Sequence, residues 1–323
     1  MVQIRWVVLL TLAAVAASVP LAADAGARLP AGEVKVASDQ PIERTLAHGG
    51  RQRSYLVIDG ARAIPAPLVI VLHGGGGNAQ NAIRMTGFDR LARREGVIAV
   101  FPNGTRGRDG AGTLLTWNAG HCCAAAMRDQ VDDVGFVGAI IDALVTSGRA
   151  DRSRVFVTGM SNGGMMAHRV GRELSTRVAA IAPVVAAVFG DEGAPRGPVP
   201  AFIVVGADDE VVPPGGGPLQ LRAILGRQRA ADRPVAPAIE QAAYWARHNG
   251  CGTAPARTRT STTEQMVWAG CRSGAPVEFH SVIGNGHAWP GGQAGRRGAD
   301  QPSTTFDATE RMWAFFKGAV GRW

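Results

Sequence analysis

The sequence predicts an α/β fold in which a mostly parallel sheet carries helices on both faces. Apolar runs of strand length alternate with segments of helical spacing along most of the 323-residue chain. Two of those runs end in glycine-rich turns, "LHGGGG" and "VTGMSNGG". In parallel sheets, functional sites gather at such strand ends. At 46% hydrophobic and 19% charged residues, the chain can bury a sizeable core.

The N-terminal residues have the layout of a secretory signal. An early arginine, an apolar run over residues 6–17 and the small residues Ala23 and Ala25 predict cleavage after Ala25. The alternative is a membrane anchor, but the run is shorter than the ~20 residues that a span needs. We therefore expect a signal peptide at residues 1–25 and a single domain at residues 26–323. The protein is expected to be secreted, extracellular or periplasmic, with no membrane contact after cleavage.

Each element follows from its residue pattern. Buried or alternating apolar runs predict two strands around the turn Gly49-Gly50, and further strands at residues 66–72, 97–102, 153–159, 178–187, 199–207 and 277–284. Helical spacing predicts helices at residues 85–96, 132–148, 162–174, 238–250 and 306–320. Residues 116–130 read as an irregular loop, and residues 188–198 leave no room for a cap domain. We therefore expect no large lid.

The net charge of +8 comes almost entirely from arginine, because Lys35 and Lys317 are the only lysines. The arginines occur singly or in pairs along the chain. Nucleic-acid binding needs a clustered basic stripe, so we expect a solvated surface and no nucleic-acid partner.

Four cysteines in an exported chain can pair, in any of three connectivities. Cys251 and Cys271 flank a polar, Thr-rich stretch, and a bridge between them would clip a surface excursion. The adjacent Cys122 and Cys123 are either a strained pair or free thiols. A catalytic cysteine is the alternative, but the chain offers a better nucleophile.

That nucleophile is Ser161. Residues 159–163 read G-M-S-N-G between a predicted strand and a predicted helix. The pattern G-x-S-x-G in this context predicts a sharp turn that exposes the serine hydroxyl, and the glycines permit the strained backbone. The helix that follows aims its N-terminus at the site, where it favours negative charge.

A serine nucleophile needs a histidine base and an acid, which follow it along the chain in this fold class. His248 falls at a helix end and His280 inside a strand, whereas His287 lies in the loop "GNGHAWPGG" directly after a strand. We therefore choose His287. Asp208 and Asp209 both follow the strand "AFIVVG", and position alone does not separate them.

Backbone N–H groups of "LHGGGG" can stabilise a developing oxyanion together with the N–H of Asn162. Gly75 is the first choice in that loop and Gly76 the second. A phosphate-binding loop is the rival interpretation, but the Lys-Ser/Thr ending of a P-loop is missing. Trp117 and Trp289 are candidates for the cleft rim, or they pack the loops.

Asp132 and Asp133 suit a helix start rather than a metal site, because no histidine or further carboxylate accompanies them. We expect neither a metal ion nor a cofactor.

Seven motifs appear in the order found in secreted polyhydroxybutyrate depolymerase/feruloyl esterase-like proteins of the LpqC type. They are "LHGGGG", "TWNAGHCC", "DDVGF", "VTGMSNGGMMAH", "GADDEVVP", "YWARHNGC" and "GNGHAWPGG". The resemblance covers roughly residues 45–320 and implies an α/β-hydrolase. Its G-x-x-D-x-x-V-P pattern selects Asp209, which implies a triad of Ser161, Asp209 and His287. It also implies that Cys251 and Cys271 pair.

Two features depart from the family pattern. Gly75 stands where many relatives carry a cysteine, and an extension follows the glycine run at residues 215–217. That extension leaves the substrate rim on its side undefined.

The motifs together predict a secreted carboxylic-ester hydrolase that acts through an acyl-enzyme. The alternatives are a serine peptidase on the same fold and a non-catalytic polymer- or glycan-binding protein. The natural ester could be a small-molecule, oligomeric or polymeric substrate: a hydroxyalkanoate, a feruloylated sugar or an acetylated glycan.

Overall fold

The computed structural model describes residues 40–106, 114–220, 231, 233–295 and 298–321. The expected signal peptide lies outside these residues. Over the described part of the chain, no helix combines the length and the hydrophobicity needed to cross a membrane.

One ten-stranded sheet organises these residues, with the strand order β1-β2-β4-β3-β5-β6-β7-β10-β9-β8. Neighbours from β4 to β10 pair in parallel, while β1 and β2 at one end and β9 and β8 at the other pair antiparallel. The strands are β1 (Ile42–His48), β2 (Arg51–Asp59), β3 (Ala66–Leu72), β4 (Ile98–Pro102), β5 (Ala150–Met160), β6 (Ala180–Val184), β7 (Ala201–Gly206), β8 (Ala256–Arg259), β9 (Thr263–Trp268) and β10 (Val277–Val282).

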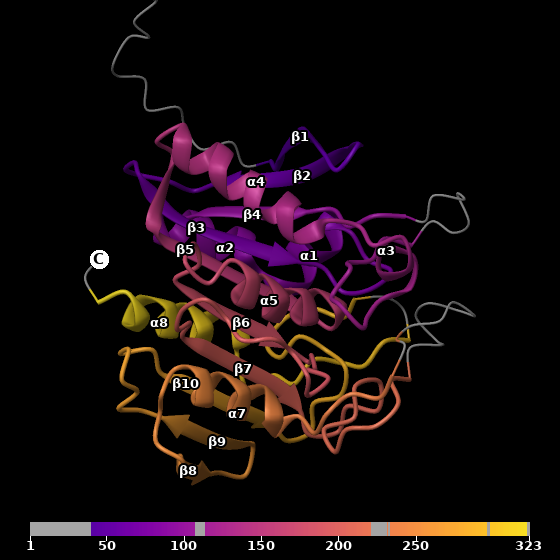
Figure 1. Ribbon diagram of the computed structural model, residues 1–323, viewed down its shortest axis with the longest axis vertical. Coiled ribbons are helices and arrows are strands. Elements are labelled where there is room, and N and C mark those ends of the chain that lie inside the picture. The colour runs from indigo at the N-terminus through magenta and orange to yellow at the C-terminus, as the bar shows by residue number, and fades with distance from the viewer. Residues whose placement is uncertain (1–39, 107–113, 221–230, 232, 296–297, 322–323) are drawn as a thin grey trace, which may run out of the picture. The chain divides into compact units, whose positions relative to one another are not determined.

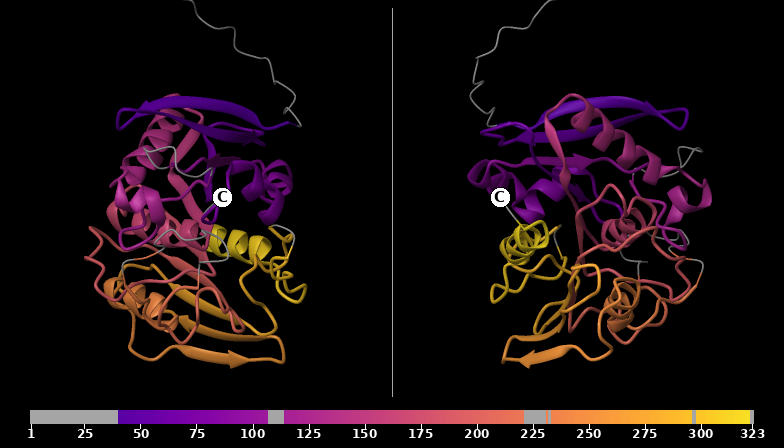
Figure 2. Two further views of the ribbon diagram at one scale, coloured as in Figure 1. Left: turned by 90° about the vertical axis from the view of Figure 1, so that its right-hand side faces the viewer. Right: turned by 60° about the vertical axis from the view of Figure 1, so that its left-hand side comes forward.

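Helices cover both faces of the sheet, as predicted (Figures 1 and 2). In the described part of the chain, the helices are α1 (Ala79–Thr86), α2 (Phe88–Glu95), α3 (Ala124–Arg128), α4 (Asp133–Thr146), α5 (Asn162–Glu173), α7 (Ile239–His248) and α8 (Ala308–Ala319). On one face α4, α5 and α7 pack against the sheet, and on the other α1, α2 and α8 do so. The central strand β3 is buried throughout, since successive side chains face the two opposite cores. This arrangement confirms the predicted fold class.

Three segments differ from the sequence prediction. The helix expected at residues 85–96 is two helices, because Gly87 adopts a left-handed conformation (φ 70°) that ends α1 and precedes α2. The expected loop at residues 116–130 contains the short helix α3. The polar excursion at residues 251–271 contains the hairpin β8–β9, and β9 pairs with β10 to extend the sheet.

Two disulfides are present in the structure. One joins Cys251 to Cys271 and closes a loop around the β8–β9 hairpin. The other joins the adjacent residues Cys122 and Cys123, both of which are fully buried.

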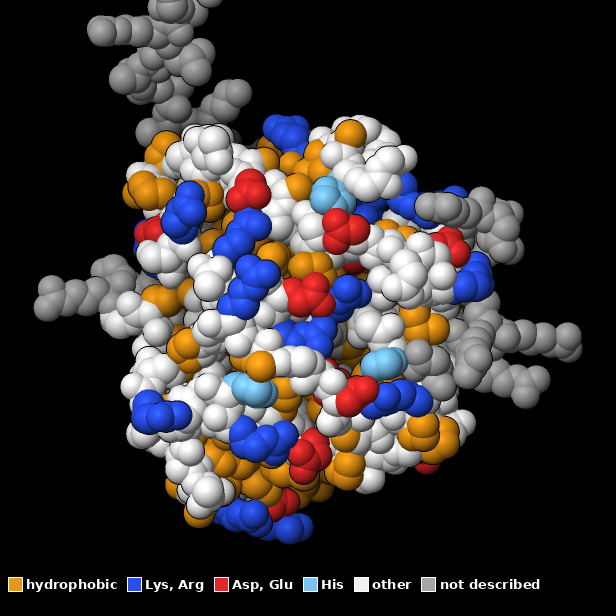
Figure 3. Space-filling view, in the orientation of Figure 1, with side chains coloured by type: hydrophobic (Ala, Val, Ile, Leu, Met, Phe, Trp, Pro, Cys, Tyr) orange, Lys and Arg blue, Asp and Glu red, His pale blue; other side chains and the backbone are white. Residues whose placement is uncertain are grey.

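The connection from β6 to β7 is short. The described residues 185–200 contain no helix, and they cross directly from one strand to the next. On the face of the molecule that Figure 3 shows, arginines are interspersed with carboxylates. Arg169, for example, pairs with Glu173 at 2.8 Å on α5.

Candidate active site

Ser161 occupies the turn between β5 and α5. Its backbone has φ 57° and ψ −123°, a conformation that L-residues rarely adopt. The flanking glycines make the turn possible: a side chain at Gly159 would collide with the Gly163 backbone, and one at Gly163 would collide with the backbone of Leu72 and His73. The local sequence therefore holds a strained serine at the carboxyl end of the central strands.

The structure brings Ser161, His287 and Asp209 into one hydrogen-bonded chain. His287 Nε2 lies 2.9 Å from Ser161 Oγ, and His287 Nδ1 lies 2.8 Å from Asp209 Oδ2. The exposed fractions are 3%, 8% and 3%, so all three groups are shielded from bulk water. With Nδ1–H donating to the carboxylate, Nε2 can accept the serine proton.

The two adjacent aspartates have different partners. The second carboxylate oxygen of Asp209 accepts the N–H groups of Val211 at 2.9 Å and Val212 at 2.8 Å. Asp208 instead accepts the N–H of Gly284 at 2.9 Å. Asp209 therefore faces the imidazole, while Asp208 ties the end of β7 to the loop after β10.

That loop carries His287 and is held by Asn285. The Asn285 side-chain amide donates to the carbonyls of Gly286 (2.8 Å) and Ala288 (3.1 Å) and accepts the Ser303 N–H (2.9 Å). The His287 N–H donates to Asp300 at 2.6 Å. These bonds fix a glycine-rich loop, so the position of His287 is held from both sides of the residue.

The two expected oxyanion donors flank the serine. Gly74 packs against it, since a Cβ at Gly74 would lie 3.6 Å from that of Ser161. The Gly76 N–H donates to the Leu115 carbonyl at 2.8 Å and is therefore engaged. Among the described residues, the N–H groups of Gly75 and Asn162 have no protein acceptor. Both can therefore donate to a substrate oxygen.

His73 supports this loop and was not among the predicted site residues. It is 1% exposed, and burial lowers its pKa to about 4, so the ring is neutral at pH 7. Nδ1–H donates to the Gly74 carbonyl at 2.8 Å, and Nε2 accepts the Gly104 N–H at 2.9 Å. The position of His73 directly before the four glycines was the available sequence signal.

The expected aromatic rim is not formed by Trp117 and Trp289. Both indoles are 0% exposed, and their N–H groups donate within the fold, to the His73 carbonyl at 2.9 Å and to Thr309 Oγ1 at 3.0 Å. Neither ring can reach a substrate, so packing of the loops is the correct interpretation.

The Cys122-Cys123 loop and the extension after Pro213 contact each other. Cys122 forms a β-bridge with Ala231, which joins these two segments. The Ala236 N–H also donates to the Val188 carbonyl at 2.9 Å in the β6–β7 connection. Residues 221–230 and 232 of the extension lie outside the described residues.

The remaining candidate groups do not enter the site. His280 pairs with Glu278 at 2.9 Å, and His248 is exposed at the end of α7. Asp132 caps α4 by accepting the Gly135 N–H at 2.8 Å, as expected, but Asp133 is fully buried. Across the residues that the structure describes, no group of three or more His, Cys, Asp or Glu side chains could hold a metal ion.

Comparison with known proteins identifies the family. The profile described as "Esterase PHB depolymerase" matches residues 53–212. NocK of Nocardia uniformis subsp. tsuyamanensis, which is named as an esterase, is 31% identical over 276 residues, 80% of this chain and 76% of that protein. The chain belongs to the esterase PHB depolymerase family. It is therefore a carboxylic ester hydrolase.

Two further likenesses, one in sequence and one in structure, are to other esterases. The bifunctional acetylxylan esterase/xylanase XynS20E of Neocallimastix patriciarum is 27% identical over 224 residues, 69% of this chain but 29% of that protein. The acetyl xylan esterase of Aspergillus awamori superposes with a TM-score of 0.52 at 15% identity, over 76% of this chain and 94% of that one. The second likeness confirms the α/β-hydrolase fold.

Proposed function

We propose that this esterase is a secreted serine hydrolase that cleaves carboxylic esters through Ser161, His287 and Asp209. The observation that carries the proposal is the continuous pair of hydrogen bonds, 2.9 and 2.8 Å long, from the strained serine through the imidazole to the carboxylate. Nucleophile, base and orienting acid in this order are what acyl transfer requires.

In the proposed reaction, Ser161 Oγ attacks the ester carbonyl carbon while His287 Nε2 takes the hydroxyl proton. The Gly75 and Asn162 N–H groups donate to the oxygen of the tetrahedral intermediate. The intermediate collapses, and His287 gives the proton to the departing alcohol, which leaves an acyl-enzyme on Ser161. A water molecule, deprotonated by His287, then attacks the acyl group; the bond to Ser161 Oγ breaks, His287 returns the proton to Oγ, and the acid is released.

The substrate class is proposed from the relatives. The names of two curated relatives refer to acetylxylan and feruloyl esters, and the family name refers to polyhydroxybutyrate. We therefore propose esters of hydroxyalkanoates, feruloylated sugars or acetylated glycans. Measuring kcat/KM for one ester of each class shows which of the three classes the enzyme prefers.

The test of the triad is Ser161→Ala. Turnover of a chromogenic acetate ester should fall by roughly three orders of magnitude or more, because the nucleophile is lost. Ser153→Ala is the matched control, since Ser153 lies toward the other end of β5, and its turnover should equal wild type. If Ser161→Ala keeps more than about a tenth of wild-type turnover, the assignment is wrong.

A related assay distinguishes the esterase from the two alternatives that the sequence left open, a serine peptidase and a non-catalytic binding protein. An esterase cleaves the chromogenic ester faster than a peptide anilide, a peptidase shows the reverse preference, and a binding protein cleaves neither. Secretion is tested by N-terminal sequencing of the exported protein, which should begin at Gly26.

A further inference from the structure

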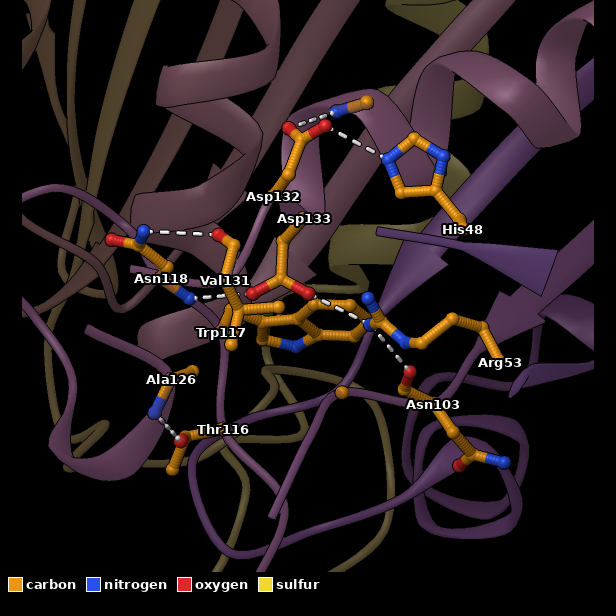
Figure 4. Close-up of polar contacts among 12 residues, drawn as sticks. His48, Arg53, Asn103, Thr116, Trp117, Asn118, Ala126, Val131, Asp132 and Asp133 are labelled. Atoms are coloured by element: carbon orange, nitrogen blue, oxygen red, sulfur yellow. Dashed lines mark hydrogen bonds and ion pairs between the residues drawn. The ribbon is translucent and has the colours of Figure 1, made fainter. Parts of the chain in front are cut away.

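Asp133 is a buried carboxylate whose two oxygens both accept hydrogen bonds (Figure 4). It is 0% exposed and lies at the start of α4. Oδ1 accepts from Arg53 Nη2 at 2.7 Å, and Oδ2 accepts from the backbone N–H of Asn118 at 2.8 Å. The carboxylate therefore joins strand β2 to the "TWN" segment at residues 116–118.

Its partner Arg53 is also buried, at 3% exposed. The guanidinium donates to the Asn103 carbonyl at 3.1 Å and lies 3.9 Å over the Phe136 ring. Burial raises the pKa of the Asp133 carboxyl, and the charge of Arg53 opposes that shift. Buried ion pairs add little net stability compared with well-packed apolar residues, because both charges lose their hydration. Stability alone therefore does not account for this pair.

The segment that Asp133 holds contacts both sides of the proposed oxyanion hole. The Trp117 N–H donates to Asn162 Oδ1 at 2.8 Å, and Asn162 Nδ2 donates back to the Trp117 carbonyl at 3.0 Å. The Trp117 indole donates to the His73 carbonyl at 2.9 Å. On the glycine-loop side, the Leu115 carbonyl accepts the Gly76 N–H at 2.8 Å.

Residues 115–118 thus form a bridge between the glycine loop and the residue after the nucleophile. On the active-site side, this bridge is hydrogen-bonded to Gly76, His73 and Asn162. On the opposite side, Asn118 contacts two charged groups: its N–H donates to Asp133, which is bonded in turn to Arg53, and its carbonyl accepts from Arg169 at 2.7 Å. Arg53 and Asp133 are therefore in a position to influence the distance between the N–H groups of Gly75 and Asn162.

We propose that Arg53 and Asp133 are a positioning pair that holds the Gly75 and Asn162 N–H groups at the spacing required by the tetrahedral intermediate. The proposal rests on the proposed function of Ser161. Neither residue touches substrate; both act through the bridge at residues 115–118. An oxyanion hole gains its effect from donors fixed in advance, so a small shift of the bridge lowers the rate of the chemical step.

The charge of Asp133 matters because both of its partners are donors. In Asp133→Asn, the new side chain has one acceptor oxygen and an NH2 group. The NH2 group must face either Arg53 or the Asn118 N–H. Because both partners are hydrogen-bond donors, one of the two hydrogen bonds is lost and replaced by a repulsive contact between two donors. The side-chain volume barely changes, and the variant therefore perturbs the bridge without creating a cavity.

The experiment compares Asp133→Asn with Asp132→Asn, its neighbour on the exposed helix cap. For Asp133→Asn we expect kcat to fall about 10- to 100-fold, with KM within about threefold of wild type. Affinity for an alkylboronic acid, which forms a tetrahedral adduct on Ser161, should fall by a similar factor. For Asp132→Asn, kcat and boronate affinity should stay within about twofold of wild type, and only stability should decrease.

A merely structural role predicts a different pattern. If Asp133→Asn loses activity only in proportion to its unfolded fraction, or keeps wild-type kcat and boronate affinity, the proposal is overturned. Asn162→Ala provides a second variant should Asp133→Asn not fold, because it retains the Asn162 backbone N–H but removes both bonds to Trp117. It should show the same joint loss of kcat and boronate affinity, and unchanged values of both would contradict the bridge.

The outcome with Ser161→Ala separates this proposal from the proposed function. If Ser161→Ala is inactive while Asp133→Asn is fully active, the positioning pair alone is wrong. If Ser161→Ala remains active, the serine assignment itself fails.

Discussion

Asp208 and Asp209 are neighbours in the chain, and their side chains lie in different hydrogen-bond networks. Asp209 is 3% exposed and bonds to His287 at 2.8 Å, while Asp208 accepts a backbone N–H from the loop after β10. Only Asp209 can hold the imidazole in the tautomer that accepts the serine proton.

Asp209→Asn should therefore reduce kcat by about three to four orders of magnitude, since an amide can stabilise the wrong tautomer of His287. Asp208→Asn should reduce kcat less than about tenfold, because its bond to the Gly284 N–H can be kept by the amide oxygen. Steady-state kinetics of both variants on one ester decide the point. A larger loss in Asp208→Asn than in Asp209→Asn would reverse the assignment.

Two buried histidines make stability depend on pH. Burial lowers the pKa of His73 and of His168 to about 4 in the folded protein, from 6.5. His168 links α5 to α7: its Nε2–H donates to Gln241 at 2.8 Å, and its Nδ1 accepts the Trp245 indole N–H at 2.9 Å. Between pH 6.5 and 4 the unfolded chain binds more protons, so the free energy of unfolding is highest above pH 6.5 and falls as pH decreases.

We expect each histidine to contribute up to about 1.4 kcal/mol per pH unit to that decrease below pH 6.5. Urea unfolding of wild type and His168→Gln at pH 7 and pH 5 measures the contribution. His168→Gln should lose less stability on acidification than wild type, whereas His248→Gln, at the exposed end of α7, should largely follow wild type. Equal losses in His168→Gln and wild type would show that His168 is not buried neutral.

The β8–β9 hairpin shows which elements the sequence does not reveal. Apolar or alternating runs predicted the strands from β2 to β7 and also β10, because those strands bury side chains on one or both faces, and the turn Gly49-Gly50 pointed to β1 beside β2. β8 is exposed throughout and β9 is half-buried, so their Thr-rich sequence resembles a loop. Their pairing with β10 is a tertiary property.

The residues of the candidate site also differ in whether the sequence reveals them. Ser161, His287 and the glycine loop have local signatures at strand ends, so the sequence predicted that they would lie together. The burial of Trp117 and the pairing of Arg53 with Asp133, 80 residues apart, depend on long-range packing. No local pattern marks such contacts, and the aromatic rim was wrong for that reason.

The disulfide between Cys251 and Cys271 belongs to the hairpin at the sheet end, away from Ser161. Replacing both cysteines with serine should reduce the free energy of unfolding by about 3 kcal/mol, as expected for a sequence separation of 20. Turnover should remain within about twofold of wild type, because β6, β7 and β10 separate the hairpin from β5. Unfolding by urea together with kinetics tests both parts. A large loss of kcat in the folded variant would contradict this separation.

At the scale of the whole molecule, the β6–β7 connection is the segment in which we would expect a lid over the serine. The described residues 185–200 cross between the strands without a helix, so this connection builds no cap of the kind that lipases use. We therefore expect an open cleft that favours short-chain esters.

Activity on tributyrin should rise smoothly through the concentration at which the substrate forms an emulsion. Hydrolysis of p-nitrophenyl butyrate should be faster than that of the palmitate. A sharp interfacial increase, or faster cleavage of the long-chain ester, would show that a lid exists.

The central claim is that Ser161 is the nucleophile of an esterase that forms an acyl-enzyme. The most direct measurement is peptide mass spectrometry after reaction with a fluorophosphonate, which phosphonylates activated serines. We expect one equivalent of label on the peptide that contains Ser161, with loss of esterase activity in step with labelling and no label in Ser161→Ala. Stoichiometric label on another residue, or full esterase activity in the labelled protein, would contradict it.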